Sequence, residues 1–479
     1  MARPKLQVLS EAEKEFIHEQ TLRVLEEVGI GYNTPLAIDL LAEAGAQVDR
    51  QRLTAKIPRQ LVSRALATVP RTVLLAAREP ANDRVVGDGS LVFTTDGTAT
   101  YMLDDVTGER REGTAEDLRT AMRLFDALPE IDFVWPSISP RDCDPAVAGL
   151  EMASLSIEGC AKHVQDEVRT PDLVDPLVDI LEGYAGSSLR ERPIYSVINC
   201  TIAPLQHDGP MTEASIALAR RGVPIFVLPM VIMGTTGPMS VVGTTIVTMA
   251  EILSAVVLFQ LAAPGCAVVS GIGSAAAEMR TGLYLCASPE VALINLYGIE
   301  MSRFYGLPVQ TSCIGVDAKR PDFQAGAEAA MTGVTEVLAG ADCLIAFGLL
   351  DGAQVLSLAK TVLDCEVVGM IKRLVRETAV DETTALYDDI RAVGIGGHYL
   401  AARSTRQRYH EGELWEPRVF RRGAFEVGGR QTLLQDAAEA ARQIVMTHQV
   451  APVSEEAQRH ARQVIAEFAR AKGAAVLVR

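Results

Sequence analysis

From about residue 90 the chain alternates between short apolar runs rich in β-branched residues and longer stretches with helical spacing. The short runs are typical of buried strands, and the longer stretches place their apolar side chains on one helix face. We predict strands at 91–95, 131–138, 161–165, 194–200, 224–232, 266–271, 307–313 and 342–347. Helices are predicted at 115–128, 145–159, 171–184, 211–221, 240–263, 288–305, 322–340 and 354–375. Eight strand–helix units of this kind predict a (β/α)8 barrel, also called a TIM barrel.

Two segments flank this repeating pattern. The first begins with one helical pattern that starts at Ser10 and ends at Gly29, and a second that starts at Thr34 and ends at Gly45. The last segment holds a loop-rich stretch followed by two helical patterns. We therefore predict an N-terminal helical extension at 1–88, the barrel at 89–378 and a C-terminal helical cap at 379–479.

A doubly wound open sheet would produce the same alternation of strands and helices. That fold usually carries a glycine-rich phosphate turn after its first strand. Here the first strand is followed by "TTDGTATYMLDDVTGERREGT", which predicts a short additional β segment before the first helix. The sequence contains neither GxGxxG nor a P-loop. The barrel is therefore the better prediction.

Composition and charge exclude several classes of protein. A hydrophobic fraction of 48% with 22% charged residues is typical of a soluble globular chain. The formal net charge of −16, without a Lys/Arg-rich run, gives no electrostatic basis for binding nucleic acid. Eight scattered cysteines without a CxxC pair indicate reduced thiols, and the beginning "MARPKLQVLSEAEKEF" lacks the apolar core of a secretory signal. Both features favour the cytoplasm.

One segment, "VVGTTIVTMAEILSAVVLFQLAA" at 241–263, imitates a membrane span in length and apolarity. It contains Glu251, Gln260 and several Thr and Ser residues. Because an unpaired carboxylate in the middle of a bilayer is costly, we predict a buried helix and no membrane association.

Catalytic groups of a (β/α)8 barrel lie at the carboxyl ends of its strands. The segment "SCIGVDAKRPD" follows the seventh predicted strand and brings Asp317, Lys319, Arg320 and Asp322 to that end. A solvated turn, held by ion pairs of Lys319 or Arg320 with Asp317 or Asp322, is the structural alternative. The other loops at this end offer few acid or base residues.

Motifs for common hydrolytic and metal chemistry are absent from the sequence, including HExxH, the EF-hand loop and the GxSxG elbow. Of the seven histidines, His163 alone falls on a predicted barrel strand, where a hydrogen-bonded core residue is the commoner outcome. A zinc site made from His163, Cys200 and Cys313 is not excluded by spacing, but nothing in the pattern favours it. We predict no metal site.

Three stretches carry a family resemblance. They are "MGTTGPMSVVGTTIVTMAEILSAVVLFQLAAPGCAVVSG", "SPEVALINLYGIEMSRFYGLPVQTS" and "VDAKRPDFQAGAEAAMTGVTEVLAGADCLIAFGLLD". The chain resembles, over nearly its whole length, the trimethylamine methyltransferase family of corrinoid-dependent methylamine methyltransferases. The resemblance implies a (β/α)8 barrel that moves a methyl group from a methylated amine to the cobalt of a separate corrinoid protein. It also implies no tightly bound cofactor in this chain, because the partner supplies the cobalamin or related methylcobamide.

The chain departs from the family pattern at one informative place. The family's founding members carry pyrrolysine near the seventh-strand loop, whereas this chain has ordinary residues there, around Ile314 to Val316. A neutral tertiary amine needs activation before it can leave, but a quaternary ammonium departs as a neutral amine without help. The sequence therefore resembles the branch without pyrrolysine, which acts on glycine betaine and related quaternary amines.

The expected substrate suggests which side chains to consider. A trimethylammonium group is bound by aromatic faces and carboxylates, and a betaine carboxylate by Lys, Arg or a helix N-terminus. Asp317 and Lys319 are the candidate catalytic residues. The candidate substrate-binding residues are Trp135, Tyr101, Phe93, Asn199, Phe347, Arg280, Arg320 and Gln324.

Three alternatives remain open at this point. They are direct methyl transfer to tetrahydrofolate, a metal-dependent barrel enzyme, and a non-catalytic protein that binds quaternary amines. The family resemblance and the large apolar content also suggest a homo-oligomer.

Overall fold

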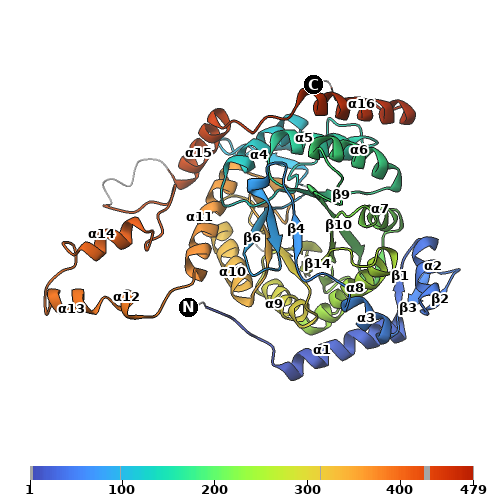
Figure 1. Cartoon of the computed structure of the whole chain (residues 1–479), viewed down its shortest axis with the longest axis horizontal. Helices are drawn as coiled ribbons and strands as arrows, with labels where there is room; N and C mark the ends of the chain where they lie inside the picture. Colours follow the sequence, from blue (N-terminus) through green and yellow to red (C-terminus); the bar gives the residue numbers. More distant parts are fainter. Residues whose placement is uncertain (1–3, 98, 313, 425–431, 478–479) are drawn as a thin grey trace.

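Eight parallel strand positions close into a barrel in the computed structural model, which describes residues 4–97, 99–312, 314–424 and 432–477. The barrel strands are β6 (Val92–Thr95), β9 (Val164–Glu167), β10 (Tyr195–Ile202), β12 (Ile225–Leu228), β14 (Val268–Ile272), β17 (Val309–Ser312) and β18 (Cys343–Ala346). From β9 onward each pairs in parallel with the next, and β18 pairs in parallel with β6. The second strand position lies between β6 and β9 and contains no regular strand. It is joined to its neighbours by two isolated bridges, Phe133 with Thr94 and Val134 with Val164. The predicted (β/α)8 barrel is confirmed, and Figure 1 looks down it.

A ring of eight helices surrounds these strands (Figure 1). They are α4 (Ala115–Ala127), α5 (Ala148–Gly159), α6 (Val174–Ala185), α7 (Gly209–Ala219), α8 (Val241–Ala262), α9 (Pro289–Phe304), α10 (Phe323–Ala339) and α11 (Leu358–Val375). A polar side chain caps the first turn of six of these helices, for example Ser288 on α9 and Asp322 on α10. Each ends within a few residues of its predicted bounds.

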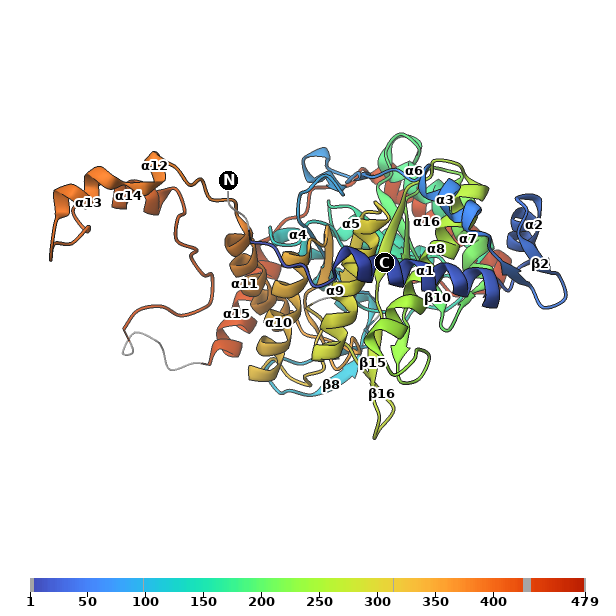
Figure 2. The same cartoon turned by 90° about the horizontal axis from the view of Figure 1, so that it is seen from below.

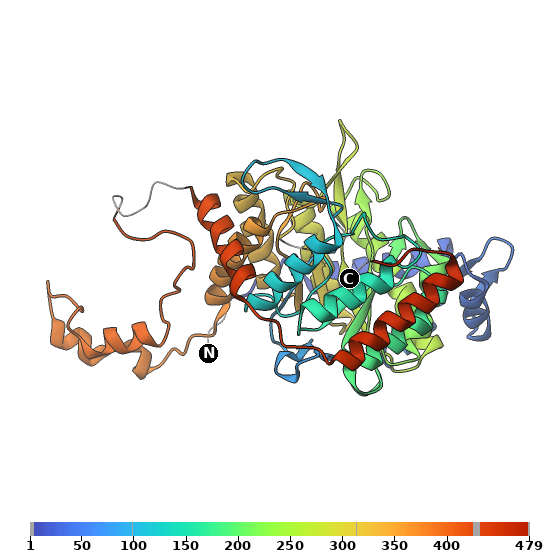
Figure 3. The ribbon, with the colours of Figure 1, turned by 90° about the horizontal axis from the view of Figure 1, so that it is seen from above.

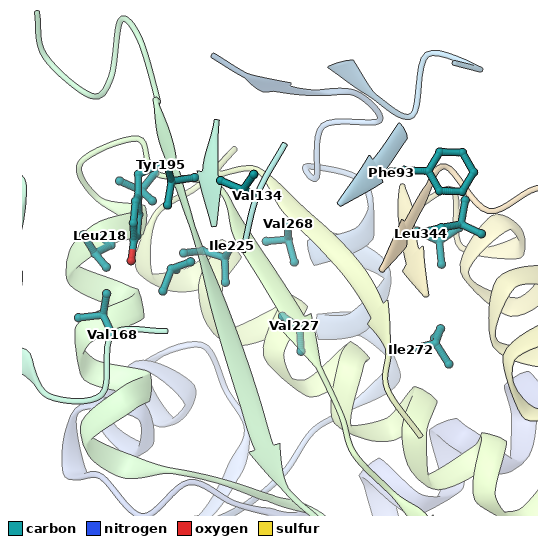
Figure 4. Packing of buried hydrophobic residues seen from close by; sticks show 14 of the residues in the cluster. Phe93, Val134, Val168, Tyr195, Leu218, Ile225, Val227, Val268, Ile272 and Leu344 are labelled. Atoms are coloured by element: carbon teal, nitrogen blue, oxygen red, sulfur yellow. The ribbon is translucent and has the colours of Figure 1, made fainter. Parts of the chain in front are cut away.

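The main hydrophobic core fills the layer between the strands and the helices. Figure 4 shows Phe93 and Leu344 at one side of this layer and Val227, Ile225 and Tyr195 at the other. The long apolar helix α8 belongs to this core: it meets the length and composition of a membrane span, but 72% of its most apolar window is buried. Its contacts with α1, α3 and α9 make it a core helix, as predicted.

The N-terminal extension contains helices and also short strands, which the sequence did not indicate. Its helices are α1 (Glu11–Arg23), continued by the π-helical turn η1 (Val24–Val28), α2 (Pro35–Glu43) and α3 (Arg59–Leu66). Strands β1 (Ile30–Gly31), β2 (Gln47–Asp49) and β3 (Thr54–Lys56) join the barrel sheet through β11 (Gln206–His207).

A second hairpin of this extension closes the lower, amino-terminal end of the barrel. It consists of β4 (Val73–Leu75) and β5 (Arg84–Val86). Val73, Leu75 and Val86 are buried and form one cluster with side chains from inside the barrel, among them Phe226 and Val269. The lower end is therefore filled by apolar side chains.

Two small sheets rise from the upper, carboxyl-terminal end. They contain β7 (Tyr101–Leu103), β8 (Arg110–Glu112), β13 (Ile232–Met233), β15 (Ala275–Glu278), β16 (Leu283–Leu285), β19 (Leu349–Leu350) and β20 (Val355–Leu356). The β15–β16 hairpin projects from this end, which faces the bottom of Figure 2 and the top of Figure 3.

After the barrel, α15 (Leu433–Thr447) packs on α11, and α16 (Glu455–Lys472) packs on α6. Between α11 and α15, three helices, α12 (Glu382–Ala385), α13 (Tyr387–Val393) and α14 (Arg403–His410), extend away from the body (Figures 2 and 3). The predicted C-terminal cap thus contains two packed helices and one projecting segment.

Candidate active site

A cavity of about 320 Å³ lies at the upper end of the barrel, where catalytic groups of this fold are found. Its walls come from the ends of all eight strand positions and from the small sheets above them. The lining residues are Asp96, Gly97, Trp135, Glu167, Cys200, Leu228, Met230, Gly273, Tyr284, Cys286, Ser312, Gly315, Ile345, Gly352, Ala353 and Gln354. The wall is mostly apolar, with a few polar groups that converge on the enclosed space, as in small-molecule sites.

Two carboxylates, Asp96 and Glu167, face this cavity. Burial raises the pKa of Asp96 to about 7, while the N–H of Gly97 and the positive charge of Lys360 lower it. Glu167 accepts a weak hydrogen bond from the Cys200 thiol at 3.5 Å. Carboxylates with so little water around them favour a cationic ligand, because a cation offsets the loss of their hydration.

The indole of Trp135 forms one wall of the cavity, and three hydrogen bonds fix the backbone and the ring of this residue. Its backbone N–H donates to Thr95 Oγ1 at 2.8 Å, and Thr95 donates back to the carbonyl of Trp135 at 2.7 Å. Nε1 donates to Asp166 Oδ1 at 3.2 Å. A Cβ on Gly97 would lie 2.2 Å from the ring, so the close approach of the indole requires glycine at that position.

Behind this wall, burial raises the pKa of Asp166 to about 7, and the nearby charge of Glu167 adds to the increase. The N–H of Glu167 and the indole N–H of Trp135 both lower that pKa. Asp166 thus orients the indole and can lose its proton near neutral pH.

Tyr284 and two thiols, Cys200 and Cys286, also line the cavity. Burial raises the pKa of Tyr284 well above its usual range, so its hydroxyl stays protonated. Burial also raises the pKa values of Cys200 and Cys286 well above the usual range, and the neighbouring carboxylates Glu167 and Asp317 add to the effect. Neither cysteine is therefore a thiolate at neutral pH, which argues against a nucleophilic role.

Asp317, a predicted catalytic residue, lies one layer behind the cavity wall. Its carboxylate accepts the backbone N–H groups of Cys286 at 2.9 Å and Ala287 at 3.1 Å. Its own N–H donates to Glu328 Oε2 at 2.8 Å. Asp317 thereby joins the loop after β17 to the start of α9 and fixes Cys286 in the wall.

The other charged residues of this loop lie outside the cavity. Lys319 is exposed and pairs with Asp351, to which Arg110 also comes within 3.7 Å. Arg320 is exposed beside Gly108. Gln324, in the first turn of α10, donates to Glu328 at 2.7 Å. The loop is thus held in place by ion pairs and hydrogen bonds, and Lys319 pairs with Asp351 rather than with Asp317 or Asp322.

The loop after β18 completes the wall with an unusual backbone. Positive φ angles occur at Phe347, Gly348, Asp351, Gly352 and Ala353. Left-handed conformations of residues other than glycine cost on the order of 1 kcal/mol each and concentrate at functional sites. They hold Gly352 and Ala353 against the cavity.

A buried ion pair beneath these loops ties them together. Lys360 Nζ lies 2.6 Å from Asp364 Oδ2 and donates to the carbonyl of Ile314 at 3.2 Å. Asp364 also accepts the N–H of Gly348 at 2.7 Å. The pair therefore connects the loops after β17 and β18 and places a positive charge near Asp96.

The remaining predicted substrate-binding residues lie in other surroundings. Phe93 and Phe347 are buried in the layer between strands and helices, with ring centroids 6.4 Å apart. Asn199 is buried there too and donates to Ser215 at 3.0 Å. Tyr101 lies under the guanidinium of Arg110, and Arg280 is exposed at the turn of the β15–β16 hairpin. Among the ten predicted residues, Trp135 is the one that lines the cavity.

His163 is a core residue inside the barrel. Nδ1 donates to the carbonyl of Ala76 at 2.8 Å, and Nε2 accepts from Ser196 at the same distance. Burial lowers its pKa to about 4, so the ring is neutral. Cys313 of the considered zinc site lies outside the described residues, and within them no three His, Cys, Asp or Glu side chains gather as metal ligands.

Few acid or base groups were expected at this end, and the three carboxyl groups Asp96, Asp166 and Glu167 lie beside Trp135. Glu167 could have been found from the sequence. Strand β9 extends two residues past its predicted end, and side chains at alternate positions face the same side, so Glu167 follows Gln165 into the barrel. Tyr284 lies on a hairpin inserted after β14, which no sequence pattern predicted.

Comparison with known proteins identifies the family. The profile described as "Trimethylamine methyltransferase (MTTB)" matches residues 1–473. A trimethylamine methyltransferase of Desulfitobacterium hafniense is 32% identical over 398 residues, covering 83% of this chain and 80% of that protein. A glycine betaine methyltransferase of the same species is 29% identical over 454 residues, covering 94% of each.

A solved structure shows the same fold. The monomethylamine methyltransferase of Methanosarcina barkeri superposes with a TM-score of 0.53 at 13% identity, over 98% of this chain and 90% of that one. The match over nearly the entire sequence, together with the barrel, confirms the predicted methyltransferase. The chain belongs to the trimethylamine methyltransferase family.

Proposed function

We propose that the chain transfers a methyl group from a quaternary amine, such as glycine betaine, to the Co(I) of a separate corrinoid protein. In this reaction the cobalt electron pair forms a bond to the methyl carbon as the carbon–nitrogen bond breaks. The nitrogen keeps the pair of electrons from that bond and leaves as a neutral tertiary amine. No proton has to move, so the protein contributes by holding the two reactants in line and excluding water.

The wall formed by Asp96, Trp135 and Glu167 is the observation that carries this proposal. An aromatic face and half-buried carboxylates together suit a cation that cannot donate a hydrogen bond. Cation–π contacts of this kind contribute roughly 0.5–2 kcal/mol each. The glycine betaine methyltransferase of D. hafniense, 29% identical along nearly the same length, supports the same class of substrate.

The carboxylate of a betaine needs donors at the other end of the molecule. Among the described residues lining the cavity there is no Lys or Arg, but Ser312 and Gln354 offer a hydroxyl and an amide. We propose these two as its partners. The predicted partners Lys319, Arg320 and Arg280 are exposed and lie outside the cavity, where their positive charge attracts the carboxylate of an approaching betaine.

The size of the cavity supports a cofactor that arrives on a partner. About 320 Å³ accommodates a small amine but not a corrinoid ring as well. We therefore propose that the corrinoid protein docks over the upper end and brings its cobalt to the methyl group. A cytoplasmic setting, with no role for nucleic acid or membrane, stays a prediction.

The test is a panel of methylated amines incubated with this protein and a reduced corrinoid protein, monitored for the methyl–Co(III) spectrum. A response to glycine betaine and other quaternary amines, lost in Asp96→Asn, would support the proposal. A response to tertiary amines alone would instead assign Asp96, with its pKa of about 7, the role of holding a protonated substrate.

Three further measurements separate the remaining alternatives. Methyl transfer to tetrahydrofolate without any corrinoid protein would replace the proposed acceptor. Tight binding of betaine with no transfer to either acceptor would indicate a binding protein, and stoichiometric zinc required for activity would indicate a metal-dependent enzyme.

A further inference from the structure

Among the residues that the structure describes, four glycines line the cavity of the candidate active site. Three of them have a structural reason to be glycine. A Cβ on Gly97 would lie 2.2 Å from the indole ring beside it, and a Cβ on Gly273 would lie 3.1 Å from a neighbouring leucine side chain. Gly352 has a φ of +60°, which side chains disfavour. The fourth, Gly315, has neither reason.

The surroundings of Gly315 leave room for a side chain. Its φ lies outside the left-handed region. A Cβ at this position would lie 3.8 Å from Cys286 Sγ and 4.0 Å from Asp96 Oδ2, and both are ordinary van der Waals distances. An alanine would therefore fit both the backbone and the surrounding protein. The missing side chain leaves space inside the cavity that the fold itself does not require.

Hydrogen bonds fix the backbone on both sides of Gly315. The N–H of Ile314 donates to a carbonyl of β18 at 3.3 Å, and its carbonyl accepts from Lys360 Nζ at 3.2 Å. The carbonyl of Val316 accepts the N–H of Gly352 at 3.0 Å. None of these bonds depends on the conformational freedom of a glycine. The loop should therefore keep its conformation when residue 315 is alanine.

The space in front of Gly315 suits one methyl group of a charged amine. The methyl group of an alanine would fit there, between Asp96 and Cys286, so a methyl group of a ligand fits as well. In a quaternary ammonium the methyl groups carry part of the positive charge, and their C–H groups are attracted to a carboxylate. A protonated tertiary amine has a hydrogen atom in place of the fourth methyl group, and this atom needs no such space to reach Asp96.

We propose that Gly315 is a specificity-determining residue, and that the space in front of it holds the fourth methyl group of a quaternary amine against Asp96. A tertiary amine leaves this space empty and loses the contacts of one methyl group. Gly315 thereby favours a quaternary over a tertiary amine. This inference rests on the proposed function, because it requires the amine to bind in this cavity beside Asp96.

The test compares the binding of two small cations, tetramethylammonium and trimethylammonium, to the full-length chain by isothermal titration calorimetry without a corrinoid protein. At pH 8 Asp96, with its pKa of about 7, is charged, and trimethylammonium still carries its proton. Gly315→Ala should raise the Kd for tetramethylammonium about tenfold or more, because one carbon too many in a closely fitting pocket costs that much. The Kd for trimethylammonium should stay near the wild-type value.

A matched control variant is Gly149→Ala on α5. A Cβ there would also make an ordinary contact, 3.6 Å from Leu173 Cδ1, but outside the cavity. Both Kd values should keep their wild-type size in this variant. Thermal melting followed by circular dichroism should show that both variants are as stable as the wild-type chain.

The ratio of the two Kd values separates this inference from the proposed function. If Gly315→Ala weakens both cations equally, or neither, while the wild-type chain binds tetramethylammonium, the inference is overturned and the proposed function stands. If Gly315→Ala weakens glycine betaine but not tetramethylammonium, Gly315 faces the carboxylate end of the substrate, which also overturns it. A wild-type chain that binds neither tetramethylammonium nor glycine betaine would overturn both.

Discussion

The two ends of the barrel differ in the side chains that they contain. At the lower end, Val73, Leu75 and Val86 of the β4–β5 hairpin pack against the barrel interior, and His163 is neutral with both ring nitrogens hydrogen-bonded. At the upper end, carboxylates with raised pKa values and a loop rich in positive φ angles surround a cavity.

This contrast separates stability from function within one set of strands. Apolar packing and satisfied hydrogen bonds at the lower end lower the free energy of the folded chain. Buried carboxylates and left-handed backbone at the upper end raise it, and such features persist where a ligand makes use of them. Substitutions at the two ends should therefore have opposite consequences for activity and stability.

The largest effect on activity is expected from Asp96→Asn. Removing one partner of a desolvated charge pair costs about 2–5 kcal/mol, which lowers kcat/KM for a quaternary amine about 30-fold or more. Steady-state kinetics with glycine betaine and the corrinoid protein would measure it. Glu251→Gln is the matched control, because Glu251 is also a buried carboxylate with a pKa near 7 but lies outside the cavity. Equal losses in both variants would contradict the assignment.

The largest effect on stability is expected at the other end, from Leu75→Ala. Leu75 is fully buried in the cluster that closes the barrel, and truncation of such a leucine costs about 2–5 kcal/mol. Urea unfolding should show that loss, while kcat/KM of the folded enzyme at 25 °C stays at the wild-type value. A large change in KM would mean that the two ends are coupled.

The pH dependence should reveal the carboxylates of the upper end. Below a pKa of about 7 Asp96 is protonated and has no charge to offer a cation, so kcat/KM should rise as the pH rises through 7. Between pH 6 and pH 8 the rise for a permanently charged amine should be up to about tenfold. The profile of Asp96→Asn should lose this rise. If Asp166→Asn removes it instead, the titration belongs to the carboxylate beneath Trp135, because Asp166 also titrates near 7.

The smallest effect is expected from Trp135→Phe, which keeps an aromatic face but loses the hydrogen bond to Asp166. A phenyl ring is a weaker cation–π partner than indole, and one hydrogen bond is worth about 1 kcal/mol, so KM should rise about threefold to tenfold. Comparison with Trp135→Leu, which removes the aromatic face, would show whether the ring itself matters. Identical values for the two variants would contradict a cation–π contact.

The barrel was predictable because its strands and helices repeat a strong pattern. Strands such as β14 and β17 are buried along nearly their whole length, as strands inside a (β/α)8 fold are. The second strand was overestimated at 131–138, where Phe133, Val134 and Ile138 form isolated bridges rather than a continuous strand. The β4–β5 hairpin was missed because strands of three residues carry almost no periodic signal.

The site was harder to predict because it depends on which way a side chain points. Phe93 and Asn199 lie on barrel strands as expected, yet each faces the surrounding helices rather than the interior. A shift of one residue in a strand reverses that direction. Lys319 and Arg320 were prominent in the sequence as charges, but exposed charges usually form ion pairs in solvent, as Lys319 does with Asp351.

The hairpin that closes the lower end has a kinetic consequence for the proposed reaction. With that route filled, the amine must enter and the demethylated product must leave by the same side that the corrinoid protein covers. Binding would then be ordered, with substrate entering before the partner docks and product departing after it lifts away. A large excess of corrinoid protein should therefore slow turnover, by trapping product inside or by covering the empty barrel before substrate arrives.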